Sequence, residues 1–410
     1  MTRNQQAFST NGKNPEPTKV VAGVVVGAAA AVWAGKRILA FSKQERPGGM
    51  VDWNRALDIA LRMNKEAALT ATEREELSGF YAELVEQCVP LITDYTGTEL
   101  PAGSRQTFAF DRVDWIHANI AGFQRMFAPI EDLDAGPGRE RGAVSAVVGS
   151  VNQTVLSAEI GMLLGYMAKR VLGQYDLALL GREPVISAGK LYYVEPNIRG
   201  IERKLNLPKN DFRMWLALHE TTHAFEFEAY PWVREYFNGL LEQYMGFMRE
   251  DAEYLKQGVD GLKLMARRVR EGRPTDEAES ASWIESFMNL DQREVFSRMQ
   301  AMMCVIEGYS NHVMNAVGLD LLENYDLISR RFEERQKQRS AGEQLFARLT
   351  GLNVKLEQYR QGEAFVNAIV ESDGREAIDR LWDGPESMPT MQEIRDPALW
   401  TSRVMATVTP

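Results

Sequence analysis

The chain has 410 residues, 45% of them hydrophobic, which is enough to bury a large core in one domain or two closely packed ones. Its formal net charge of −10 and isoelectric point near 5.2 argue against a nucleic-acid-binding protein. The two cysteines, Cys88 and Cys304, are too few for a disulfide framework, and both lie in apolar stretches. We therefore expect two buried, unpaired thiols and no nucleic-acid partner.

Residues 1–50 differ in composition from the rest of the chain. They begin with the polar residues 1–19, which we expect to be disordered, continue with the apolar, uncharged residues 20–35, and then reach Lys36 and Arg37. A helix over residues 20–35 measures about 24 Å, which is shorter than the roughly 30 Å core of a bilayer. Extension of that helix over residues 20–41 would close the gap, because the two basic side chains can reach the interface.

Three interpretations of this N-terminal segment stay open. Residues 20–41 form a membrane anchor, a signal peptide cleaved near residues 32–34, or a soluble helix packed on the domain. In the anchor interpretation, Lys36 and Arg37 favour a cytoplasmic position for the main domain. We therefore expect a cytoplasmic protein, with or without a membrane anchor, whose main domain covers residues 51–404.

Beyond residue 50 the pattern of apolar residues is mainly helical. Apolar side chains recur at three- and four-residue spacing in segments 52–64, 73–96, 111–128, 145–172 and 324–380. A further helix is predicted from Asp291, because Asp291 and Glu294 have the spacing of a capping box. The segment 145–172 is long and apolar, but its charged residues favour a buried core helix over a membrane span. The predicted fold class is mainly α.

The strand signals lie at residues 184–186 and 191–194, separated by a short stretch that contains Gly189. This pattern predicts a small β-hairpin just before the next helix. A strand edge near an active helix can bind an extended peptide by adding it to the sheet. A purely structural hairpin is an equal alternative.

The run HETTH is the most informative motif in the chain. A helix advances about 100° per residue, so His219 and His223 lie one turn apart on one face, where two imidazoles can bind one Zn²⁺. Glu220 between them is the expected catalytic base, acting on a water molecule. The predicted helix has its N-cap at Asn210 or Asp211 and ends at Tyr230-Pro231.

A catalytic zinc site needs a third protein ligand. Glu226 lies near the face of the two histidines but a further turn along the axis, so a straight helix holds it beyond the metal. Glu307 fits better, because it is a lone carboxylate on a separate apolar helix and needs a partner. Asn311, one turn later, is a candidate acceptor for a ligand histidine. His312 points about 140° away from Glu307 and is a candidate donor to a developing oxyanion, or else a structural histidine.

Several longer segments resemble a known family. They are FDRVDWIHANIAGF, VLGQYDLALLG, LYYVEPNI, DFRMWLALHETTHAFEFEAYPWVREY, MCVIEGYSNHVMNAVG, LNVKLEQYRQGEAFV and PTMQEIRDPALW. Together they resemble the Zincin_2-type family of zinc-dependent metalloproteases, some of whose members are associated with deazaflavin-coenzyme biosynthesis. The resemblance covers about residues 51–404, and the sequence departs from the family pattern at Glu226, Asn311 and Asn315.

The resemblance implies a mainly helical zincin-like fold with a small β element. It implies His219 and His223 as zinc ligands, Glu307 as the third ligand and Glu220 as catalytic base. The expected function is that of a zinc-dependent hydrolase, specifically a metallopeptidase acting on a peptide or protein. The alternative is a non-catalytic, zinc-stabilised binding or scaffold protein, associated with a membrane through residues 20–41. The sequence indicates no oligomeric state.

Overall fold

The fold is described from a computed structural model over residues 51–66, 68–131, 143–176, 190–256, 288–337 and 352–406. The predicted anchor or signal segment, residues 20–41, lies outside the described residues. In the part of the chain that is described, no helix has the length and apolarity needed to cross a membrane. The predicted mainly helical fold is confirmed, with one small sheet.

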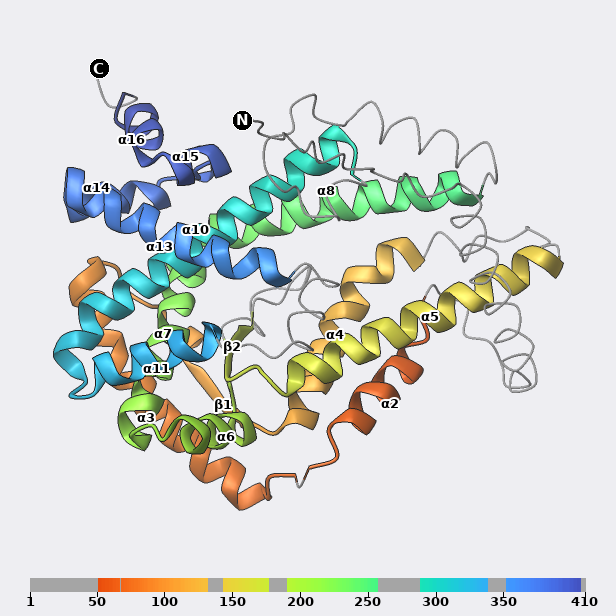
Figure 1. Cartoon of the computed structure of the whole chain (residues 1–410), viewed down its shortest axis with the longest axis horizontal. Coiled ribbons are helices and arrows are strands. Elements are labelled where there is room, and N and C mark those ends of the chain that lie inside the picture. Colours follow the sequence, from red (N-terminus) through yellow and green to blue (C-terminus); the bar gives the residue numbers. More distant parts are fainter. Residues whose placement is uncertain are drawn as a thin grey trace, which may run out of the picture.

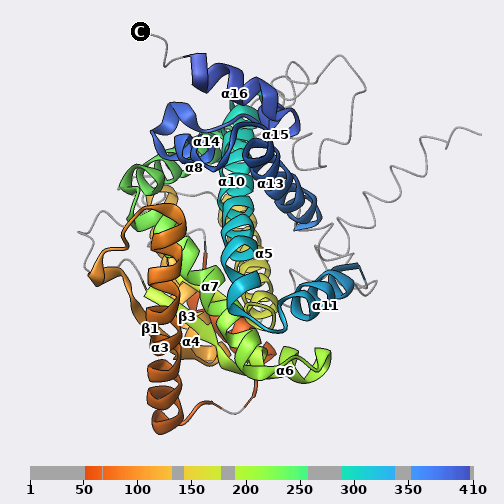
Figure 2. The same cartoon turned by 90° about the vertical axis from the view of Figure 1, so that its left-hand side faces the viewer.

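The longest described helix, α10 (Leu290–Leu321), runs through the middle of the molecule. It packs on α13 (Leu352–Asp373) on one side and on α7 (Lys209–Glu228) on the other, and α3 (Ala71–Thr96) packs beside α7 (Figure 2). These four helices supply most of the larger hydrophobic core. The predicted motif helix and the predicted carboxylate helix are therefore direct neighbours.

A three-stranded sheet lies against α3 and α7. Its strands are β1 (Gln106–Phe110), β2 (Gly173–Asp176) and β3 (Lys190–Val194), in the order β1-β3-β2. The central strand β3 pairs parallel with β1 and antiparallel with β2. The predicted strand 191–194 is confirmed as β3, but its antiparallel partner is residues 173–176. Residues 184–186 lie outside the described residues.

A second, smaller core joins α2 (Trp53–Met63), α4 (Arg112–Glu131) and α5 (Ala143–Ala168) (Figure 1). Helices α2 and α5 approach each other closely at Gly161, where an ideal Cβ would lie only 2.5 Å from the Ala56 carbonyl oxygen. Only glycine permits this contact. The predicted core helix at 145–172 is thus confirmed in outline, packing one face on α2.

The remaining elements complete the outside of the fold. They are α6 (Glu195–Leu205), α8 (Pro231–Lys256), α11 (Tyr325–Lys337), α14 (Arg375–Asp379), α15 (Met391–Arg395) and α16 (Pro397–Ala406), with short 3-10 helices at Ala102–Ser104, Arg380–Trp382 and Pro385–Ser387. Both cysteines are buried and free, as predicted.

Two predicted helix caps are wrong. The N-cap of α10 lies two residues earlier than expected, because Asn289 and Gln292 form the capping box in place of Asp291 and Glu294. Helix α7 begins after Pro208 without a side-chain cap. The carboxylate of Asp211, one of its predicted caps, instead accepts hydrogen bonds from the backbone and side chain of Asn324 between α10 and α11.

Candidate metal centre

Helix α7 brings the two motif histidines together. It is buried between α3, α10 and the sheet, and the residues around the motif, such as Leu218 and Ala224, are fully buried. The rings of His219 and His223 lie edge to face with centroids 4.6 Å apart. Their side chains are 19% and 12% exposed, so both remain open to a small ion. The one-turn spacing predicted from the sequence is therefore realised.

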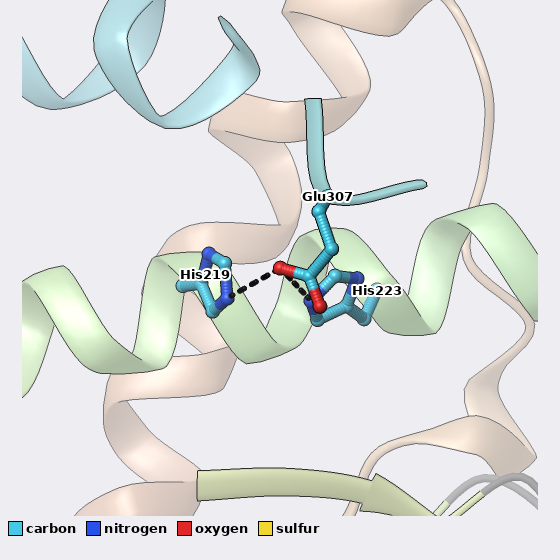
Figure 3. Close-up of side chains that lie close together, drawn as sticks. All are labelled: His219, His223 and Glu307. Atoms are coloured by element: carbon cyan, nitrogen blue, oxygen red, sulfur yellow. Dashed lines mark ion pairs between the residues drawn. The ribbon is translucent and has the colours of Figure 1, made fainter. Parts of the chain in front are cut away.

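Helix α10 supplies the carboxylate that faces both rings. Oε2 of Glu307 lies 4.0 Å from Nε2 of His219 and 4.0 Å from Nε2 of His223 (Figure 3). One ligand atom from each of the three residues lies within 4.8 Å of the others. The three residues predicted as ligands are thus brought together by two packed helices, although Glu307 is far from the histidines in the chain.

These residues fit a zinc ion. Zinc lies about 2.0–2.2 Å from nitrogen and oxygen ligands, so two ligand atoms on one ion are separated by at most about 4.4 Å. The two nitrogen–oxygen distances of 4.0 Å meet that limit. Two imidazoles and one carboxylate are also a donor set of catalytic zinc sites, in which a further position stays open for water or substrate.

Glu220 lies against strand β2, which is an outer strand of the sheet among the described residues. Its carboxylate accepts a hydrogen bond from the backbone N–H of Tyr175, and the α-carbon of Gly173 packs directly on it. Burial raises the pKa of Glu220 to about 7; the carboxylate of Glu307 adds to this rise, whereas His223 opposes it. A carboxyl group with a pKa near neutrality can both accept and release a proton, as a general base requires.

The outer nitrogen of His223 is held by two residues. Nδ1 lies 2.7 Å from Oε2 of Glu226 and 3.0 Å from Oγ of Ser310. Burial alone would lower the pKa of His223, but the carboxylates of Glu226, Glu307 and Glu220 outweigh it and raise that pKa to about 9. The expected acceptor, Asn311, does not occupy this position, because Glu226 and Ser310 already fill it.

His219 has a different environment. Its ring stacks on the indole of Trp215, with centroids 6.3 Å apart. Burial, reinforced by the neighbouring His223, lowers the pKa of His219 to about 3, so this imidazole is neutral and its Nε2 can act as a ligand. Its Nδ1 is buried and has no hydrogen-bond partner among the residues that the structure describes.

The structure does not bring His312 into this group. Its Nε2 lies 2.6 Å from the hydroxyl of Tyr95 on α3, and its Nδ1 lies 2.7 Å from Oδ1 of Asn367 on α13. Both ring nitrogens are therefore engaged in joining three helices. The predicted donation to an oxyanion has no support in this arrangement, and the structural interpretation of His312 explains both contacts.

Comparison with known proteins is consistent with this geometry. The profile of a family described as zincin-like metallopeptidases, Zincin_2, matches residues 51–401. The chain belongs to this family. Membership supports a zinc hydrolase as the general class of the protein and implies zinc as the general cofactor of its site.

One solved structure provides a second comparison. It is a crystal structure from Chloroflexus aurantiacus, described as "a putative hydrolase with a novel fold". The two sequences are 40% identical, the match covers 87% of this chain and 99% of the other, and the TM-score is 0.61. No curated protein matches the chain.

Sequence reasoning missed several contributors to the site, among them Gly173, Tyr175, Glu226 and Ser310. Gly173 and Tyr175 lie on a four-residue strand, and no alternation of apolar and polar residues predicts it. They contact Glu220 only in the folded structure. Glu226 is excluded as a ligand by helix geometry, but its role beside a ligand was not predicted. Its spacing of three residues from His223 was the signal that could have predicted a contact with the outer nitrogen of that ring.

Proposed function

We propose that this protein is a zinc-dependent peptidase in which His219, His223 and Glu307 bind the metal and Glu220 is the general base. The observation that carries the proposal is the position of Glu307, whose Oε2 lies 4.0 Å from Nε2 of each histidine. Glu220 is the neighbour of the first ligand on the same helix and is held against β2. The proposed ligands and the proposed base therefore lie close together on the packed helices α7 and α10.

The chain's own groups divide the chemistry between them. Zinc bound there would supply a Lewis acid, which polarises a carbonyl group and lowers the pKa of a water molecule toward about 7. Glu220 takes a proton from the attacking water and passes it to the nitrogen of the departing amine. The low pKa of His219 keeps its nitrogen available for the metal rather than for a proton.

Strand β2 supports a peptide as the substrate. Among the described residues it is an outer strand, and the hydrogen bond from Val194 N–H to the Leu172 carbonyl sets its register against β3. In this register the backbone groups of Gly173 and Tyr175 point away from β3, and the backbone N–H of Tyr175 donates to Glu220. An extended peptide can pair with backbone groups along such an edge, and this would place its backbone beside Glu220.

The test compares wild type with Glu220→Gln. Both proteins should bind one equivalent of zinc, because Glu220 is not a ligand. Wild type should cleave members of a peptide library, and Glu220→Gln should cleave them about 10² to 10⁴ times more slowly, the range that a general base contributes. Zinc content is measured by elemental analysis and cleavage by mass spectrometry.

Glu371→Gln is the matched control, since it removes an exposed carboxylate on α13, away from the three ligands. It should retain both zinc and cleavage. Equal rates for wild type and Glu220→Gln, or no peptide cleaved by the zinc-loaded wild type, would rule out the proposed peptidase.

A further inference from the structure

Beyond the three ligands, the site contains a second layer of polar contacts that is confined to one histidine. Glu226 follows His223 by three residues on α7, and Ser310 follows Glu307 by three residues on α10. His223 and Glu307 are therefore each followed, one turn later, by a polar residue that faces the helix interface. The two polar residues meet, with Ser310 Oγ 3.4 Å from Oε2 of Glu226.

The carboxylate of Glu226 is costly to bury and has one strong partner. Its side chain is fully buried, Oε2 lies 2.7 Å from Nδ1 of His223, and Oε1 has no hydrogen-bond partner within the described residues. A buried charge of this kind destabilises the fold unless a positive charge compensates it. A cation bound at the other nitrogen of the His223 imidazole would provide that compensation.

The same contact fixes the chemical state of the ligand. An ionised carboxylate only accepts hydrogen bonds, so Nδ1 of His223 must carry the proton that it donates. A bound metal would then replace the proton on Nε2, the atom that faces Glu307, and use its lone pair. The hydroxyl of Ser310 donates to Glu226 from α10 and so ties the helix of Glu307 to the helix of the histidines.

We propose that Glu226, assisted by Ser310, is a positioning residue for metal binding that makes His223 the anchoring ligand of the centre. This proposal rests on the proposed function, because it assumes that the three ligands hold a metal. His219 has no equivalent support, since its Nδ1 is buried without a partner in the described part of the chain. The two histidines of the motif are thus unequal, although the sequence presents them alike.

The experiment measures zinc affinity rather than catalysis. Apo-protein is titrated with zinc against a competing chelator for wild type, Glu226→Gln, Glu226→Ala and Ser310→Ala. Glu226→Gln keeps an acceptor but removes the charge, and it should weaken binding about tenfold; Glu226→Ala should approach the roughly hundredfold loss that removal of such outer partners causes. Ser310→Ala should have a smaller effect in the same direction.

The matched control is Glu228→Gln. Glu228 lies two residues further along α7, is almost as buried, and pairs with Arg234 and the Tyr175 hydroxyl rather than with a ligand. Its zinc affinity should equal that of wild type. In the cobalt-substituted proteins, the visible absorption of Glu226→Gln should shift, whereas that of Glu228→Gln should not, because only Glu226 alters the donor strength of a ligand.

The outcomes separate this inference from the proposed function. Zinc affinities of Glu226→Gln and Glu226→Ala within twofold of wild type would overturn the positioning role while leaving the peptidase in place. A wild type that binds no zinc would overturn both. If the Glu226 variants bind zinc more weakly than wild type does, and wild type cleaves no peptide, the positioning role is supported and the peptidase is rejected.

Discussion

The position of Glu220, the proposed general base, depends on the absence of a side chain at residue 173. An ideal Cβ at Gly173 would lie 2.4 Å from Oε1 of Glu220 and 2.6 Å from its Cγ and Cδ. All three distances are far below van der Waals contact, so any other residue at 173 must displace Glu220 or β2. The backbone φ at Gly173 is not in the left-handed region, and therefore the glycine is needed for space rather than for backbone conformation.

Gly173→Ala should therefore impair catalysis without removing the metal. A displacement of about 1 Å in a reacting group can lower a rate about 10²-fold, and we expect a loss of that order in kcat/KM for a cleaved peptide. Zinc stoichiometry should stay at the wild-type value, because the atoms nearest to an ideal Cβ at residue 173 belong to Glu220, which is not a proposed ligand.

Gly200→Ala serves as the control for this substitution. It adds the same methyl group on α6, where an ideal Cβ has no other atom within 4 Å, and it should keep full activity. If Gly173→Ala were as active as Gly200→Ala, contact with β2 would not position Glu220.

At the scale of elements, the position of Glu307, the proposed third ligand, depends on how α10 and α13 cross. Gly308, the neighbour of Glu307, faces Gly362 of α13. An ideal Cβ at Gly308 would lie 2.2 Å from the carbonyl carbon of Gly362, and one at Gly362 would lie 1.9 Å from the carbonyl oxygen of Cys304. The two helices are in backbone contact at these glycines. The position of α13 therefore helps to set the position of α10, and with it the distance of Glu307 from the two histidines.

Gly362→Ala should separate these helices. We expect a loss of about 1–3 kcal/mol in the free energy of unfolding, the usual result of overpacking, together with weaker zinc binding. Denaturant titration and zinc titration measure the two effects. Gly79→Ala in α3, where a Cβ meets no atom within 4 Å, should instead stabilise the protein by about 0.5–1 kcal/mol. Loss of stability with unchanged zinc affinity would mean that Glu307 does not depend on this crossing.

Elements with local signals could be predicted from the sequence, and elements defined by distant contacts could not. Helices α2, α3, α4 and α5 follow apolar periodicity and lie close to their predicted ranges. Strands β1 and β2 have five and four residues, and β1 pairs with β3 across an intervening segment that contains α4 and α5. No short-range pattern indicates such a pairing. The starts of α10, after Asn289, and of α7, after Pro208, were missed because neighbouring polar residues were equally good candidates for the N-cap.

The candidate site shows the same division. The spacing of His219 and His223 sets the ligand pair by helix geometry alone, and the isolation of Glu307 in an apolar helix indicated a partner. The same helix geometry places Glu226 a turn beyond the metal, which is where it meets the outer nitrogen of His223. The partners of His312 lie on α3 and α13, so only the packed structure could identify them.

At the scale of the whole molecule, the three proposed metal ligands lie beside a large hydrophobic core that does not include them. The main cluster of buried hydrophobic residues extends over α3, α7, α10 and α13 and continues into the C-terminal helices, where Trp400 is fully buried. The ligands occupy one point of the interface between α7 and α10. Small domains that fold only with zinc lack a core of this size. A purely structural role for the metal is therefore poorly matched to this architecture.

Metal removal provides the test at this scale. After chelation, the protein should keep its helical circular dichroism and unfold cooperatively, because the core does not need the ion. Added zinc should stabilise it only by mass action, about 2.7 kcal/mol when free zinc is about 100 times its dissociation constant. His219→Ala should lose this zinc-dependent increment and otherwise unfold as the metal-free wild type does. Collapse of the helical signal on chelation would instead favour a structural zinc in a non-catalytic scaffold, since only a fold that requires its metal loses secondary structure with it.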